Sequence, residues 1–215
     1  NIHGECLTFF MSTYTITELP LLISTPLEWA TKVLADPIDL LNDHAHLEKK
    51  AANNAMDMLN RWPTNPPPAS WVANMIHVAK DEVEHLHVVN KLLERRGGVM
   101  SKSHKNAYAA ALNGLIRLGE GHKEHVDRLL VSALIECRSC ERFALLAEAS
   151  DGVDDELHHL YSELWRSEHG HYAVFLEMAR LITSESIDER WALFLEEEAK
   201  IIQQQPFSCS MHGWV

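Results

Sequence analysis

The sequence predicts an all-α protein built from long amphipathic helices. Apolar residues recur with helical spacing from about Pro26 to Gln205. No segment shows sustained period-two alternation of β-branched residues between turn signals, as half-buried strands would. Turns rich in proline or glycine separate the helical patterns. These turns divide the chain into four long helices and several short ones.

Two proline-initiated helices open the pattern. Thr25-Pro26 predicts a short helix, and Asp36-Pro37 predicts a long one that runs to about Arg61. In both pairs a capping side chain precedes a proline, which is well tolerated at the first helical position. Trp62-Pro63 then stops the long helix, and a proline-rich connection follows over residues 63–68.

The second long helix covers Ser70 to Arg96 and ends at Gly97-Gly98. A crossover helix is predicted from Asn106 to Leu118, a third long helix from Gly121 to Ala149, and a fourth from about Val153 to Thr183. Ser186-Ile-Asp-Glu189 fits a capping box, which predicts a last helix to about Gln204.

Two long hairpins joined by a long crossover are the connectivity of a ferritin-like four-helix bundle, here with extra short helices. A length of 215 residues suits one domain. We therefore expect a single domain over residues 1–215, with residues 1–10 a disordered or non-native extension before Met11.

Composition narrows the function classes. The formal net charge of −12 opposes generic nucleic-acid binding, which uses a large basic surface. No apolar run approaches the roughly 20 residues that cross a bilayer. The cysteines include one CxxC, Cys137 and Cys140, without the second pair of a zinc site. These features favour a cytoplasmic protein with reduced thiols.

Four Glu-x-x-His motifs occur, and only two of them lie on apolar faces. Such a motif is weak evidence in a chain rich in both residues, but positions i and i+3 share one helix face. Glu82 and His85 interrupt the apolar stripe of the second long helix, and Glu168 and His171 interrupt that of the fourth. Ionisable groups within a core stripe are costly unless they are paired or bind metal.

The other two long helices would each supply one glutamate to such a site. Glu48 lies on the inner face of the first. The third offers Glu136 and Glu141, about 140° apart, so both cannot point to one place. Glu136 is the better candidate, because its interval of 32 positions to Glu168 resembles the 34 positions from Glu48 to Glu82. Glu141 remains the alternative.

Carboxylate and imidazole ligands without thiolate favour iron, with manganese second. Four carboxylates can hold two ions with open positions, where O₂ can be activated. A bundle in which the six residues only form buried hydrogen bonds is the structural alternative. His44, one turn before Glu48, could orient a ligand, although such a residue is more often plain core.

Four segments carry a resemblance to a known family: Asp43-His-Ala-His-Leu-Glu-Lys-Lys50, Ala79-Lys-Asp-Glu-Val-Glu-His85, Ile135-Glu-Cys-Arg-Ser-Cys-Glu-Arg-Phe143 and Ser167-Glu-His-Gly-His171. With them, nearly the whole chain after Met11 resembles the bacterial tRNA isopentenyl-adenosine hydroxylases, the MiaE family of non-haem di-iron monooxygenases. The ligand roles carry over onto Glu48, Glu82, His85, Glu136, Glu168 and His171.

The resemblance implies hydroxylation of the isopentenyl side chain of 2-methylthio-isopentenyl-adenosine at position 37 of tRNA. It also implies two iron ions, O₂ as co-substrate and an external electron donor. The richest basic stretch, Arg95, Arg96, Lys102 and Lys105, is the predicted tRNA contact, with the anticodon loop as partner. The alternative is a ferritin- or rubrerythrin-like di-iron oxidase or ferroxidase.

Overall fold

The computed structural model describes residues 19–214, and the predicted extension over residues 1–10 lies outside that range. Within residues 19–214 there are helices and no strand, which confirms the all-α class. The elements are α1 (Leu27–Val33), α2 (Pro37–Met58), η2 (Leu59–Arg61), α3 (Ala69–Arg95), α4 (Ala107–Asn113), α5 (His122–Ser150), α6 (Asp155–Ile182) and α7 (Asp188–Gln203).

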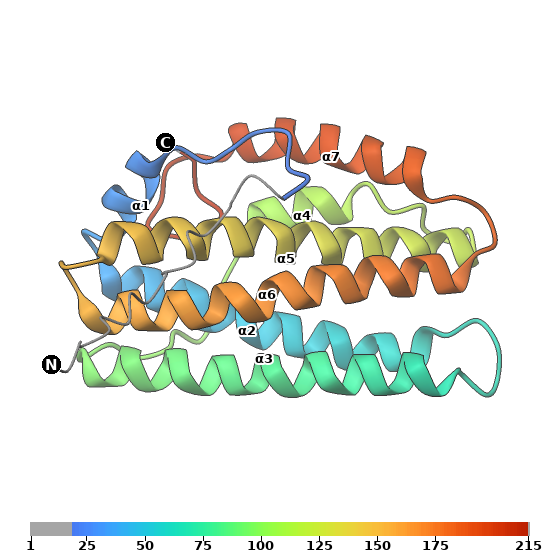
Figure 1. Ribbon diagram of the computed structural model, residues 1–215, viewed down its shortest axis with the longest axis horizontal. Coiled ribbons are helices and arrows are strands. Elements are labelled where there is room, and N and C mark those ends of the chain that lie inside the picture. Colours follow the sequence, from blue (N-terminus) through green and yellow to red (C-terminus); the bar gives the residue numbers. More distant parts are fainter. Residues whose placement is uncertain (1–18, 215) are drawn as a thin grey trace, which may run out of the picture.

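Two antiparallel hairpins form the bundle. The α2–α3 hairpin and the α5–α6 hairpin lie side by side in Figure 1. The long connection between α3 and α5 contains α4, and α7 packs against α4 and α5 on the outside of the bundle. The predicted ferritin-like connectivity is therefore confirmed.

Local signals set most helix ends. The Asp36 carboxylate accepts the Asp39 N–H at 3.2 Å, which caps α2 ahead of Pro37 as expected. At the end of α3 the Gly98 N–H donates to the Leu93 carbonyl and the Gly97 N–H to the Glu94 carbonyl. This pairing requires a left-handed residue, and Gly97 supplies it with φ 82°.

Two predicted caps are wrong. The N-cap of α1 is Pro26, and Thr25 instead donates from its backbone and hydroxyl to the Glu141 carboxylate. The Ser186 hydroxyl donates to the Asp188 carboxylate and accepts the Asp188 N–H at the first residue of α7, so it does not form the predicted capping box with Glu189, and the N-cap is Ile187. In each case the hydroxyl bonds to a partner other than the one that the pattern assigned to it.

The crossover helix is shorter than predicted. Asn106 caps α4 as the N-cap residue, accepting from the Ala109 N–H at 3.0 Å, but the helix ends at Asn113 rather than Leu118. Beyond it, Arg117 donates from its backbone and its guanidinium to the buried Asp127 carboxylate. That tether holds the chain in a non-helical path before α5.

The apolar core is divided into two clusters along the bundle axis. On α2, the residues before Glu48 belong to one cluster and those from Ala55 onward to the other. The same change occurs around Glu82 on α3, Glu136 on α5 and Glu168 on α6. Polar residues from all four long helices thus meet at mid-bundle, between two apolar layers.

Candidate metal centre

The mid-bundle layer contains all six predicted ligands. Two groups of potential ligand atoms lie within 4.8 Å of one another. One group comprises Glu48, Glu82, His85 and Glu168, and the other comprises Glu82, Glu136, Glu168 and His171. Glu82 and Glu168 belong to both groups. The arrangement therefore has two halves, each with one further glutamate and one histidine, joined by two shared carboxylates.

Both histidines direct Nδ1 at the shared carboxylates. His171 Nδ1 lies 2.7 Å from Glu82 Oε1, and His85 Nδ1 lies 3.3 Å from Glu168 Oε1. Each imidazole thus approaches the carboxylate of the opposite helix, and its own i−3 glutamate is farther away, at 3.7 Å for His85 and 3.8 Å for His171. The Glu-x-x-His spacing places both residues on one inner face, and the antiparallel pairing of α3 and α6 brings the two faces together.

Burial and crowding shift the pKa values of the cluster. Desolvation, together with the charges of neighbouring glutamates, holds the pKa of Glu48 and of Glu136 well above the usual carboxyl range. Burial alone would lower the pKa of the histidines, but the adjacent Glu168 and Glu82 carboxylates raise it to about 9 for His85 and about 11 for His171. The layer is an electronegative pocket that favours cations.

The oxygen and nitrogen atoms of the cluster are arranged to bind metal ions rather than to form hydrogen bonds with one another. Both carboxylate oxygens of Glu82 and of Glu168, and Nδ1 of both histidines, are buried without hydrogen-bond geometry to any partner. Buried polar atoms are ordinarily satisfied, so close approach without hydrogen bonding is better explained by a shared ion. Oxygen and imidazole donors without thiolate fit iron or manganese.

The thiols stand apart from the cluster. Cys140 donates to the Trp165 carbonyl at 3.5 Å, and burial raises the pKa of Cys137 to about 12. Cys209 is half-buried in the C-terminal segment, and Cys6 lies outside the described residues. Neither thiol of the CxxC is placed as a ligand.

Two further side chains orient the cluster from outside. His44 Nε2 lies 2.5 Å from Glu48 Oε1, so the orienting role considered for His44 fits its position. Asp81 Oδ2 lies 3.5 Å from Nε2 of His171, at ion-pair distance without hydrogen-bond geometry, and a carboxylate on that side favours the ring orientation that presents Nδ1 inward. The sequence reasoning missed Asp81, because only the packing of α3 against α6 brings it to His171.

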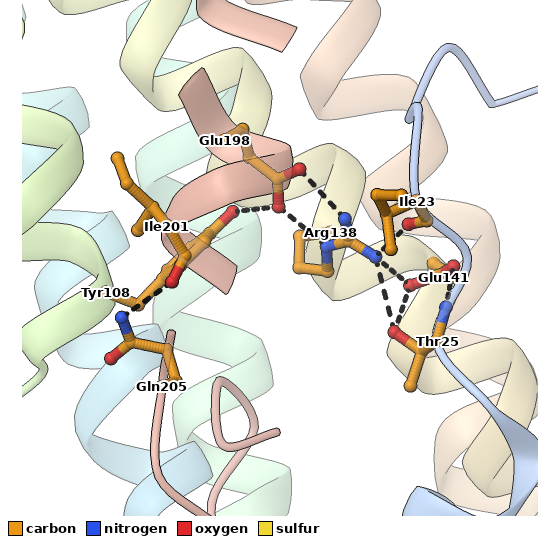
Figure 2. A network of polar contacts seen from close by, with 8 residues as sticks. All are labelled: Ile23, Thr25, Tyr108, Arg138, Glu141, Glu198, Ile201 and Gln205. Atoms are coloured by element: carbon orange, nitrogen blue, oxygen red, sulfur yellow. Dashed lines mark hydrogen bonds and ion pairs between the residues drawn. The ribbon is translucent and has the colours of Figure 1, made fainter. Parts of the chain in front are cut away.

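Glu141 is buried but belongs to a different network, which Figure 2 shows. Arg138 bonds to Glu141 and to Glu198 of α7, with Nε 2.8 Å from Glu198 Oε1 and Nη2 2.9 Å from Glu198 Oε2. Thr25 donates to both Glu141 oxygens, and the Tyr108 hydroxyl donates to Glu198 at 2.9 Å. Both carboxylate oxygens of Glu141 thus accept from protein donors, and Glu136 is the α5 residue that lies in the cluster.

The remaining Glu-x-x-His motifs are exposed. Glu84 and His87 on α3, and Glu156 and His159 on α6, face solvent, as their polar helix faces predict. They serve as spacing-matched controls for the buried pairs.

The predicted basic stretch is divided. Arg96 forms a bidentate pair with Asp154 at 2.7 Å for both contacts, and Arg95 pairs with Glu156 at 2.9 Å. Lys102 and Lys105 are exposed on the connection that leads to Asn106 and have no ion pair within residues 19–214. The two arginines of the stretch are therefore paired with carboxylates, and the two lysines are not.

The fold and the paired carboxylate–histidine halves define a ferritin-like protein with a buried centre suited to two metal ions. A solved structure supports this class: Protein 43 with aldehyde deformylating oxygenase activity, from Synechococcus, has a TM-score of 0.80 and 32% sequence identity over 90% of this chain and 96% of its own.

The chain belongs to the MiaE family. The family model tRNA-(MS2IO6A)-hydroxylase (MiaE) matches residues 14–213. The tRNA 2-(methylsulfanyl)-N(6)-isopentenyladenosine(37) hydroxylase of Pseudomonas putida KT2440 is 34% identical over 192 residues, covering 89% of this chain and 90% of that protein. The enzyme of the same name from Salmonella typhimurium LT2 is 32% identical over 80% of this chain, and 61% of its own length is covered.

Among residues 19–214, no helix combines the length and apolar character that a bilayer span requires.

Proposed function

We propose that this protein is a non-haem di-iron monooxygenase that hydroxylates the isopentenyl side chain of 2-methylthio-isopentenyl-adenosine at position 37 of tRNA. The observation that carries the proposal is the pair of four-residue groups sharing Glu82 and Glu168 at mid-bundle. Membership of the MiaE family, and the names of the Pseudomonas and Salmonella relatives, support the substrate.

In this proposal Glu48, Glu82, His85, Glu136, Glu168 and His171 hold two iron ions. Bound iron supplies activation of O₂, with electrons from an external donor. The chain itself supplies the charge balance, because four carboxylates offset the charge of two divalent ions. It also limits the access of bulk water, because apolar clusters flank the centre on both sides along the bundle. Asp81 and His44 keep a histidine and a glutamate in position.

The proposed macromolecular partner is the anticodon loop of a cytoplasmic tRNA. A loop presents an unstacked base and needs few phosphate contacts, which is compatible with a net charge of −12. Of the four basic residues predicted to contact tRNA, Lys102 and Lys105 are the better candidates, because Arg95 and Arg96 already bind carboxylates. Neutralising a phosphate with either arginine would first require breaking an ion pair.

The test is mass spectrometry of nucleosides from tRNA that carries the prenylated adenosine, after incubation with iron-loaded protein, reductant and O₂. We expect a gain of one oxygen with the wild type and with His159→Ala, and none with His171→Ala. His159 has the same helix and motif spacing as His171 but faces solvent. A loaded wild-type protein that adds no oxygen would overturn the proposal.

The ferroxidase alternative predicts different behaviour. A storage protein would oxidise iron in excess of two ions per chain without tRNA and would assemble into a large shell. Size-exclusion chromatography and iron titration without RNA distinguish this outcome from the hydroxylase.

A further inference from the structure

A surface pocket of about 220 Å³ opens between α2, α4 and α5. Its lining changes character with depth. Lys50 and Asn113 are exposed at the surface, Leu47 and Ile135 are half-buried, and the buried Glu136 lies at the inner end. A polar mouth thus gives way to an apolar wall that ends at a predicted metal ligand.

A second, smaller cavity of about 20 Å³ adjoins the pocket on the side of the candidate metal centre. Leu47, Ala51, Ile135 and Glu136 line both spaces. The smaller cavity also touches Glu48 and Glu168 of the cluster. Apolar side chains from α2 and α5 therefore form a continuous wall from the surface pocket to the carboxylates.

Two asparagines in the pocket each have an amide oxygen in a fixed orientation. The Asn54 amide donates to the Ser132 hydroxyl at 2.9 Å, and the Asn113 amide donates to the Ala109 carbonyl at 2.7 Å. These bonds use the amide NH₂ groups and orient the amide oxygens, for which no partner exists within residues 19–214. An oriented amide oxygen accepts from an N–H of a ligand.

Basic groups are also present at this pocket, despite the acidic chain. Lys50 and Arg128 both line it. Arg128 is partly compensated by Glu124 at 2.8 Å, whereas Lys50 contacts His104 and no carboxylate among the described residues. The pocket therefore suits a ligand with an apolar end for the inner wall, a polar ring for the asparagines and negative charge at the mouth.

We propose that this pocket binds the prenylated adenine, with the five-carbon side chain along Leu47, Ala51 and Ile135 and the base at Asn54 and Asn113. A prenylated N6 atom retains one N–H, which either amide oxygen can accept, and the phosphates lie nearest Lys50. The terminal carbons then approach the end of the pocket at Glu136. This inference rests on the proposed function and specifies the substrate site for it.

The first test measures binding by metal-free protein of an anticodon stem-loop RNA, with and without the isopentenyl group, by fluorescence anisotropy. We expect the prenylated RNA to bind at least about tenfold more tightly, since tenfold corresponds to burial of roughly two methylene groups. Ala109→Leu extends into the pocket from α4 and should abolish that preference. Ala111→Leu makes the same change on the exposed side of α4, outside the pocket, and should preserve it.

The second test measures the polar contact. Asn54→Ala should raise KM for prenylated tRNA about tenfold, with kcat and iron content unchanged. Asn53→Ala, exposed on the same helix and outside the pocket, should leave KM unchanged. Melting temperature and iron content of each variant show whether it is folded, and the two variants act on different helices.

The two proposals fail separately. Either of two results overturns the pocket assignment even when hydroxylation proceeds. One is equal binding of both RNAs by the wild type. The other is an undiminished preference for the prenylated RNA in Ala109→Leu together with an unchanged KM in Asn54→Ala. Preferential binding of the prenylated RNA without oxygen insertion by the iron-loaded enzyme overturns the hydroxylase and leaves the pocket in place.

Discussion

The two buried glutamates of α5 should respond in opposite ways to the same isosteric change. Glu141→Gln should lower stability and leave iron content unchanged, whereas Glu136→Gln should lower iron content. Oε1 of Glu141 accepts the Thr25 N–H at 2.8 Å, and Oε2 accepts the Thr25 hydroxyl at 2.6 Å and an Arg138 N–H. A glutamine in either orientation therefore places its NH₂ against a donor.

The magnitude follows from what remains around Arg138. Removing one partner of a buried ion pair costs about 3–5 kcal/mol. Because Arg138 keeps both bonds to Glu198, we expect the lower end, about 3 kcal/mol. For a chain of this size that corresponds to a fall in Tm of roughly 6–12 °C, at about 2–4 °C per kcal/mol.

The assay combines thermal unfolding with iron analysis of each purified variant. Glu148→Gln changes an exposed glutamate of the same helix and should alter neither quantity. For Glu136→Gln, the metal-free protein should be no less stable than the wild type, because burial and neighbouring carboxylates already raise the pKa of Glu136. The reasoning is refuted by loss of iron in Glu141→Gln with full iron in Glu136→Gln.

Three further predictions concern the same centre and its surroundings. Asp81→Asn should weaken iron binding by about tenfold or more, because it loosens His171; chelator competition measures this, and unchanged affinity contradicts it. The Tm of the metal-free protein should fall as pH rises above about 5, because the pKa values of Glu48 and Glu136 are higher in the folded than in the unfolded state and their contribution to stability is lost as they ionise. The Tm of the iron-loaded protein should depend less on pH. A Tm of the metal-free protein that does not change with pH would contradict the electrostatic argument. The buried Cys137 thiol, with its pKa raised to about 12, should react with iodoacetamide only after unfolding; rapid labelling of native protein, detected by mass spectrometry, would be inconsistent with its burial.

Periodicity accounted for much of the candidate centre. A helix repeats its faces every 3.6 residues, so the sequence alone separates Glu82 and His85 from the exposed Glu84 and His87. The same reasoning separates the Glu168 motif from the Glu156 motif on α6. Chain connectivity then indicates which faces meet, because short turns make each hairpin antiparallel.

Capping was less predictable, because a hydroxyl can bond to any donor or acceptor that folding brings near it. Thr25 precedes a proline, as a cap should, yet it binds Glu141, 116 positions away in the chain. Asp36 has the same sequence context and does cap its helix. The difference lies in the tertiary environment of each side chain rather than in the local pattern.

The sequence by itself determined the all-α class, the long helices, the inward faces and the residue types of the mid-bundle carboxylate–histidine cluster, because these depend on local spacing and chemistry. Tertiary structure decided which α5 glutamate joins the cluster, since Thr25 bonds to Glu141, and Glu198 of α7 to Arg138, only in the folded bundle. It also placed Asp81 beside His171 and formed the pocket beside Glu136, which α4 helps to line. Those features arise from contacts between helices, and the spacing within one helix does not contain them.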